Sequence, residues 1–117
     1  MHNQIRQKRI FDALDLTDAA AVSTPVDINR QRPDGYFSCQ LRVTGAGSVT
    51  VSAEGSLDGV NFVPLDGCTV FETFGASSGP NADGHGLAGY YPPPVRHLRY
   101  RAVATGTVNI SAVHCNQ

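Results

Sequence analysis

Residues 35 to 59 alternate apolar and polar side chains twice, and this alternation constrains the fold more than any other feature of the chain. The first run places apolar side chains at every second position, namely Phe37, Cys39, Leu41 and Val43. The second run repeats the pattern after a glycine-containing turn, with Val49, Val51 and Ala53. Successive strand side chains point to opposite faces, so each run predicts a strand with one buried and one solvated face. We expect the two strands to pair across the turn and bury a common apolar face.

The remainder of the chain contains further strand patterns separated by turn residues. The region from Leu98 to Ala112 alternates on both sides of Thr105-Gly106 and predicts a second hairpin. An earlier strand between residues 21 and 30 is interrupted by Pro25, which favours a position at a sheet edge. Shorter strands are expected near residues 62–65 and 69–74, with Phe71 and Phe74 on opposite faces unless a bulge intervenes. The sequence therefore predicts an all-β fold, a single antiparallel β-sandwich or jelly-roll-like domain of about seven or eight strands.

The 117 residues fit one domain, whose ends and loops differ in character from its strands. Residues 1–18 contain no glycine or proline and are interpreted as an N-terminal arm, extended or partly helical, with a frayed terminus as the alternative. Residues 19–117 are assigned to the sandwich. Within it, residues 75–89 contain five glycines and predict a long exposed loop, either a contact loop or a disordered one. Tyr90 and Tyr91 then precede three prolines, which favour a stiff extended segment.

Charge and cysteine content exclude several classes of function. The formal net charge of −1 provides no long-range field to attract nucleic acid or an anionic membrane, so we expect protein partners. The longest apolar run covers only residues 19–22, which predicts no membrane span, no signal peptide and a protein made soluble in a cytoplasm. The three cysteines show no CxxC spacing, which argues against a zinc or disulfide framework. Cys39 is expected to pack as a small apolar side chain.

We find no residue constellation that predicts catalysis. The four histidines are not spaced as metal ligands usually are, and the chain lacks a nucleophile elbow, a P-loop and a dinucleotide fingerprint. Asp58 and Asn61 are explained by a turn better than by calcium. We therefore predict a non-enzymatic protein with no catalytic residue, cofactor or metal. The alternative from another class is a carbohydrate-binding module with Tyr36, Tyr90 and Tyr91 as platform residues, although the chain has no tryptophan.

Three segments together resemble a known class of proteins. They are residues 36–43, the turn Ser-Leu-Asp-Gly-Val-Asn-Phe at residues 56–62, and the stretch Leu-Arg-Tyr-Arg-Ala at residues 98–102 followed by Thr-Gly-Thr-Val. The combination resembles small β-sandwich virion structural proteins of tailed bacteriophages. The resemblance implies a capsid decoration or cement protein that binds between capsid subunits. Head–tail connectors and tail or fibre-attachment proteins of similar architecture are the alternatives.

The resemblance also implies partners and a location. We expect a homo-oligomer, for which a trimer is one arrangement, bound to the major capsid protein or other virion proteins. The chain would be made in the host cytoplasm and reside in the virion. The expected contacts lie in the arm, at the end of the glycine-rich loop and in a row of arginines: Ile5, Arg6, Arg9, Ile10, Phe11, Tyr90, Tyr91, Arg99 and Arg101.

Overall fold

The computed structural model describes residues 6–28 and 36–116, and these residues form strands and turns without a helix. The strands are β1 (Arg6–Thr17), β2 (Ala20–Val22), β3 (Val26–Asp27), β4 (Phe37–Thr44), β5 (Ser48–Ser56), β6 (Val63–Gly75), β7 (His85–Tyr90), β8 (His97–Thr105) and β9 (Thr107–Asn116). The predicted all-β sandwich is confirmed. Within the described ranges no helix is long and apolar enough to cross a membrane.

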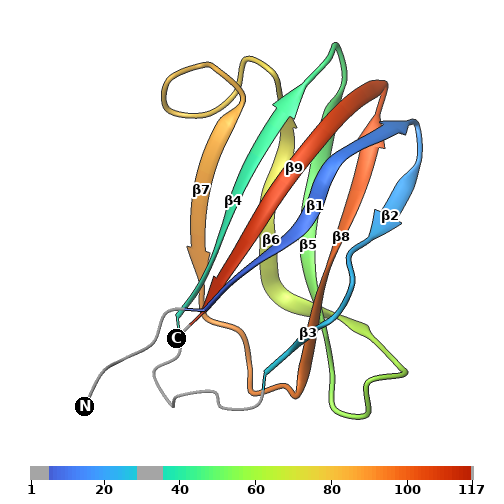
Figure 1. Cartoon of the computed structure of the whole chain (residues 1–117), viewed down its shortest axis with the longest axis vertical. Coiled ribbons are helices and arrows are strands. Elements are labelled where there is room, and N and C mark those ends of the chain that lie inside the picture. Colours follow the sequence, from blue (N-terminus) through green and yellow to red (C-terminus); the bar gives the residue numbers. More distant parts are fainter. Residues whose placement is uncertain (1–5, 29–35, 117) are drawn as a thin grey trace.

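The strands build two antiparallel sheets that pack face to face (Figure 1). One sheet has the order β1-β9-β4-β7, and the other has the order β2-β8-β5-β6, with β3 pairing with β8 beyond β2. Because β2 and β3 both pair with β8, they act as one interrupted strand. The chain then alternates between the sheets at most connections, which is the double Greek-key winding of an eight-stranded jelly roll.

Both hairpins expected from the sequence are instead connections between the two sheets. β4 pairs with β7 and β9, whereas β5 pairs with β6 and β8, so consecutive strands face each other across the core. The same is true of β8 and β9, which pass between sheets at Gly106. An alternating pattern shows only that one face of each strand is buried. Two such strands can bury their apolar faces by pairing in one sheet, or by lying in two sheets that face each other across the core, as they do here.

The core lies between the inward faces of the two sheets. Leu41 and Cys39 are fully buried, as expected from the alternation, and Tyr100 is the largest fully buried side chain. Phe62 lies in the connection before β6 and is only half-buried. The Arg99 guanidinium carbon lies 4.4 Å from the centre of its ring. Phe62 thus covers an arginine at the margin of the sandwich.

The segment set apart as an N-terminal arm contributes, from Arg6 onward, the edge strand β1 of the four-stranded sheet. It pairs with β9 along its length, and Ile10, Phe11 and Leu16 are buried in the core. The partly helical alternative is wrong for these residues. Two register shifts and a positive φ of 47° at Ala13 interrupt the strand. Such bulges displace apolar side chains from strict alternation, so this strand does not show the two-residue period of the others.

The glycine-rich segment at residues 75–89 is only partly a loop. Gly75 ends β6 and residues 85–89 belong to β7, so the connection itself covers residues 76–84. Gly86 lies against two aromatic rings, since a β-carbon there would come within 2.8 Å of both Phe71 and Phe74. Those rings contact each other with centroids 5.0 Å apart, because a bulge with a positive φ at Thr73 intervenes between them. Here glycine marks close packing rather than flexibility.

Candidate functional site

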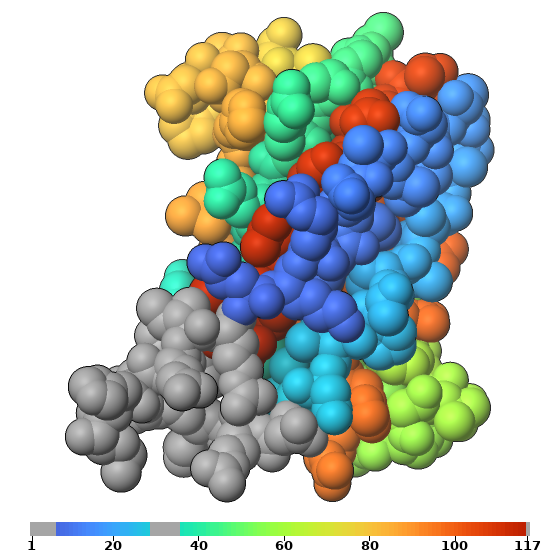
Figure 2. Space-filling model, viewed as in Figure 1, coloured from blue at the N-terminus to red at the C-terminus, as the bar shows by residue number. Residues whose placement is uncertain are grey.

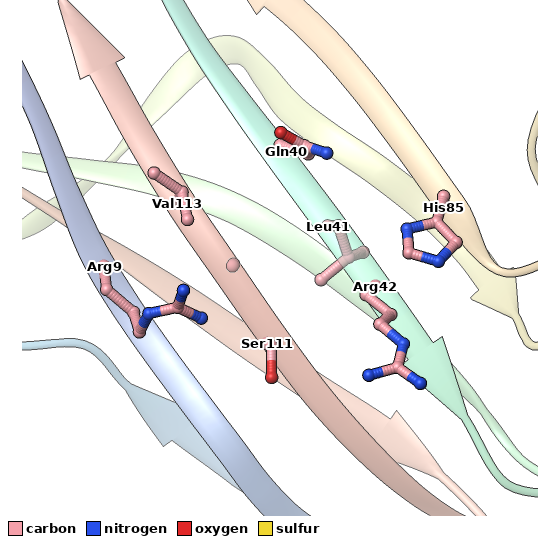
Figure 3. A pocket seen from close by; sticks show the side chains of 8 residues that line it. Arg9, Gln40, Leu41, Arg42, His85, Ser111 and Val113 are labelled. Carbon is pink, nitrogen blue, oxygen red and sulfur yellow. The ribbon is translucent and has the colours of Figure 1, made fainter.

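The outer face of the four-stranded sheet carries a shallow, basic hollow of about 290 Å³ (Figure 3). Four strands line it, with Arg9 from β1, Gln40 and Arg42 from β4, His85 from β7 and Ser111 from β9. Figure 3 shows the two arginine side chains on either side of β9, with His85 beside Arg42. We call this feature the basic hollow.

Strand register brings these side chains together from distant parts of the sequence. Arg42 lies opposite His85 on one side and opposite Ser111 on the other, while Arg9 and Gln40 both lie opposite Val113. All of them occupy the outward positions of their strands, because the alternate positions fill the core. The hollow therefore follows from the same alternation that builds the sandwich.

The basic hollow is suited to binding anionic oxygens. The guanidinium of Arg9 lies 4.0 Å from the exposed Asp12 carboxylate, a contact too long and too solvated to hold the arginine firmly. Among the described residues, no carboxylate lies within ion-pair distance of Arg42. The Ser111 hydroxyl accepts a hydrogen bond of 2.9 Å from the Ala13 amide, which occupies it structurally. The arrangement offers charge and hydrogen-bond donors but no activated nucleophile.

A second hollow of about 220 Å³ adjoins the first and shares Gln40 and His85 with it. Its other lining residues are Pro80, Asn81, Gly86 and Leu87. Figure 2 shows the connection between β6 and β7 as a knob that projects beyond the sheet at this end of the molecule. The two hollows together extend across the outer face from β1 to β7.

An exposed aromatic pair lies on the same sheet. Tyr36 and Tyr91 are 47% and 69% exposed, and their ring centroids are 4.5 Å apart. The ring of Tyr36 lies over Gly89, where an added β-carbon would approach the tyrosine hydroxyl to 2.1 Å. Gly89 is thus required for this position of the ring. Tyr36 and Tyr91 were both expected as platform residues, and the structure brings these two together.

Tyr90, the third expected platform residue, is buried instead. Its hydroxyl is 2.5 Å from the Tyr100 hydroxyl, which is 2.6 Å from Nδ1 of His114, and Nε2 of His114 is 2.8 Å from Oδ1 of Asn116. We call these four residues the buried polar chain. Burial raises the pKa of both tyrosines and lowers the pKa of His114, so all three are neutral near neutral pH. Burial likewise raises the pKa of the neighbouring Cys39 thiol to about 12.

Eight of the nine residues predicted as contacts separate into three groups. Ile5 lies outside the described residues, and Arg6 lies in β1. Ile10, Phe11 and Tyr90 are buried, so as the chain is folded they stabilise the core rather than face a partner. Arg9, Tyr91 and Arg101 are exposed, the first two on the four-stranded sheet and Arg101 on β8 of the other sheet. Those three remain predicted contacts.

Arg99 is held within the domain. Its Nε donates a 2.7 Å hydrogen bond to Oε1 of Glu54, which is buried opposite it on β5, and Phe62 covers the guanidinium. The arginine thereby neutralises a buried carboxylate, whose isolation would be costly. Arg99 and Arg101, expected to act together at an interface, therefore differ in how freely they can contact a partner.

The Asp58 carboxylate is engaged by hydrogen bonds within its own turn. The Asp58 carboxylate accepts hydrogen bonds from the amides of Asn61 and Val60, from the Asn61 side chain and from Ser56, and these bonds lower its pKa. Its oxygens are consumed by the turn, as the sequence suggested. In the described part of the chain, no three His, Cys, Asp or Glu side chains cluster in a way that could hold a metal ion.

Arg42, Gln40 and His85 were not identified as site residues from the sequence. The first two are visible as outward positions of the alternating run at residues 37–44. Their meeting with His85 depends on the pairing of β4 with β7, whose residues are more than forty positions apart in the chain. No local pattern specifies that pairing.

Comparison with known proteins identifies the fold and no family. No protein-family model and no curated protein matches the chain. A solved structure of the infectious bursal disease virus VP2 subviral particle is similar over 97% of this chain and 32% of that chain, with a TM-score of 0.68 and 6% identity. A chain of the Gx strain of that virus gives a TM-score of 0.58 at 8% identity, over 97% of this chain and 32% of that chain.

The SPBc2 prophage-derived protein YomS is similar in size as well as in fold. The match covers 98% of this chain and 97% of YomS, with a TM-score of 0.54 and 10% identity. By contrast, the chain spans only about a third of the viral capsid chains it matches. At these identities the similarity establishes a shared jelly-roll fold alone. This fold recurs in viral capsid proteins.

Proposed function

We propose that this protein is a non-enzymatic structural component of a virus particle, most specifically a decoration protein that binds the outer surface of a capsid. The observation that supports it is the complete jelly roll, matched end to end by a prophage-derived protein and over 97% of the chain by part of a subviral-particle protein. A function rests on a site rather than on a fold, so the surface must also suit the role.

The outer face of the four-stranded sheet is suited to attachment by contact area. Arg9 and Arg42 can form bidentate ion pairs with carboxylates of a capsid subunit, and Tyr91 offers an exposed aromatic ring just beyond the other end of β7. The two hollows on this face are shallow, and polar and basic side chains contribute to the lining of both. A homo-oligomer that repeats this face would bind many equivalent capsid sites with high avidity from modest single contacts.

Attachment is tested by cosedimenting the purified protein with empty capsids of the particle from which it comes, stripped of their accessory proteins. We expect saturable binding in a fixed ratio to the major capsid subunit. The variant Arg9→Gln/Arg42→Gln should bind at least about tenfold more weakly, a loss of about 1.4 kcal/mol. Arg101→Gln, the remaining arginine contact and on the opposite sheet, tells the two faces apart: it should bind more tightly than the double variant if the four-stranded sheet is the attachment face.

The number of copies bound per particle distinguishes a decoration protein from a head–tail, tail or fibre protein. A few copies per particle would place the protein at the head–tail junction, the tail or a fibre, and would contradict decoration. If the protein does not bind capsids at all, the proposal that it is a structural component of the virus particle is wrong. Tyr36 and Tyr91 then favour a second candidate, a carbohydrate-binding module, because an exposed aromatic pair can stack on a sugar ring. Glycan-array binding lost in Tyr91→Ala would support that candidate.

A further inference from the structure

Three of the edges of the two sheets, as far as the structure describes them, carry features that discourage pairing with another chain. β1 contains two register shifts, β6 contains three register shifts and a proline, and the β2–β3 edge is broken at Pro25. β7 differs from them. Its six residues keep unbroken register with β4 from His85 to Tyr90 and include no bulge, proline, lysine or arginine. An edge of regular register without these protective features is a template for an added strand.

The backbone of β7 presents free pairing positions at this edge. The Val43 amide donates a 2.8 Å hydrogen bond to the carbonyl of Gly84, in register with the β4–β7 pairs. Hydrogen-bonded pairs recur at every second residue of an antiparallel ladder, so residues 84, 86, 88 and 90 are directed toward β4. The N–H and C=O groups of His85, Leu87 and Gly89 therefore point away from the sheet. Of these, the His85 amide donates to Oδ1 of Asp83 at 3.2 Å.

We propose that β7 pairs antiparallel with β7 of a second copy of this chain, on a two-fold axis through Leu87, so that two four-stranded sheets join into one. In this register Leu87 lies opposite Leu87 of the other copy, and His85 lies opposite Gly89. Leu87 is 72% exposed and would bury its side chain against its symmetry mate. An isologous contact of this type is the commonest route to a homodimer.

The two ends of β7 are electrostatically complementary, and this complementarity favours a second copy as the occupant. At one end His85 and the neighbouring Arg42 supply positive charge or N–H donors, while at the other end the Tyr36 ring covers Gly89 beside Tyr91. The two-fold axis brings unlike ends together, so cationic groups of one copy meet the π faces of the other. The 220 Å³ hollow beside His85 leaves room at the same end for the partner's aromatic pair.

This interface follows from the edge of β7 and does not depend on the virion proposal. The sharpest test of its register is a symmetric disulfide. Directly opposed residues of a hydrogen-bonded antiparallel pair have Cα atoms about 5.5 Å apart, within the roughly 4.4–6.8 Å that a disulfide spans. We would introduce Leu87→Cys in a Cys115→Ser background, since Cys39 and Cys68 are buried, and oxidise it with diamide. The matched control is Val103→Cys, which lies exposed on the other sheet.

We expect Leu87→Cys to form a covalent dimer at least about tenfold faster than Val103→Cys. Light scattering of the unmodified protein should show concentration-dependent dimers. Leu87→Pro removes the outward N–H at the axis while keeping the bonds to β4, so it should weaken the dimer more than Leu87→Thr does. Leu87→Glu places two carboxylates opposite each other and should give monomers whatever the fate of the proline variant.

A protein that stays monomeric at every concentration, with equal cross-linking at the two cysteine positions, would overturn the proposal. So would a dimer that Leu87→Glu leaves intact, because the contact would then lie elsewhere. None of these measurements uses capsids. Failure of particle binding and failure of this interface are therefore distinguishable.

Discussion

At the scale of single residues, the buried polar chain shows how this sandwich accommodates polar atoms in its core. A neutral His114 accepts a hydrogen bond from the Tyr100 hydroxyl at Nδ1 and donates one from Nε2 to Oδ1 of Asn116, while the Tyr90 hydroxyl donates to Tyr100. Every member thus has a partner, and among the described residues no buried side-chain nitrogen or oxygen lacks one. A fully bonded network of this kind favours a single arrangement of the core.

The same network makes stability depend on pH. Burial lowers the pKa of His114 in the folded protein, whereas in the unfolded chain it titrates near the ordinary value of about 6.5. Between these two pKa values the unfolded state binds more protons, so the free energy of unfolding decreases as the pH falls below about 6.5. We expect urea unfolding midpoints to decrease between about pH 7.5 and about pH 5. The nearby Lys8 adds to the lowering of the pKa.

His114→Gln is the informative variant, because glutamine can accept from Tyr100 and donate to Asn116 without titrating. It should flatten the pH dependence between about pH 7.5 and about pH 5. His85→Gln, at an exposed position, is the matched control for removing a histidine. An unchanged slope in His114→Gln would show that other groups cause the acid destabilisation.

At the scale of elements, the sequence predicts strands well and their partners poorly. Leu41, Val51 and Tyr100 were placed on inward faces by alternation, and all three are fully buried. Alternation reports which face is buried but not which strand lies beside it, so the connections at residues 45–47 and 106 were interpreted as hairpins. β1 was missed because its bulges disturb the period. The basic hollow was missed because it depends on which distant strands pair with one another, and alternation does not specify that pairing.

The two inter-sheet connections contact each other, and this contact can be tested. A β-carbon on Gly47 would lie 2.3 Å from the carbonyl oxygen of Thr105 and 2.8 Å from the carbonyl carbon of Gly106. Both neighbours are backbone atoms and cannot rotate away. Gly47→Ala should therefore destabilise the protein by about 1–3 kcal/mol, as overpacking usually does.

Ala46→Ser, at the adjacent exposed position, should change stability by no more than about 0.5 kcal/mol. Chemical denaturation of both variants compares the two connections directly. Equal stability of Gly47→Ala and the parent would mean that the connections do not touch, as in two independent hairpins.

At the scale of the whole molecule, β1 belongs to the sandwich and not to a separate arm. It covers the edge of β9 and contributes Ile10, Phe11 and Leu16 to the core. Of the residues of β1 that were predicted as contacts, some therefore pack in the core while others face outward. Arg9 faces outward into the basic hollow, while Ile10 and Phe11 face inward.

Deleting residues 1–11 should consequently unfold the domain or convert it to a poorly packed state. Loss of the Phe11 side chain alone is expected to cost about 3–5 kcal/mol, against a total stability of about 5–15 kcal/mol for a domain. The truncation also uncovers the edge of β9 at residues 112–116, which pair with residues 6–11. Thermal unfolding followed by circular dichroism should show a lost or strongly lowered transition.

Two full-length variants separate packing from contact. Phe11→Ala should reproduce much of the destabilisation, whereas Arg9→Gln should keep the parental transition and weaken only partner binding. If the truncated chain instead unfolds at the parental temperature, β1 does not contribute to the core and residues 1–11 act as an arm after all. If the truncated chain unfolds as expected, its failure to bind a particle does not show whether residues 1–11 contact that particle. The attachment surface must then be judged from Arg9→Gln and Arg42→Gln, which leave the sandwich intact.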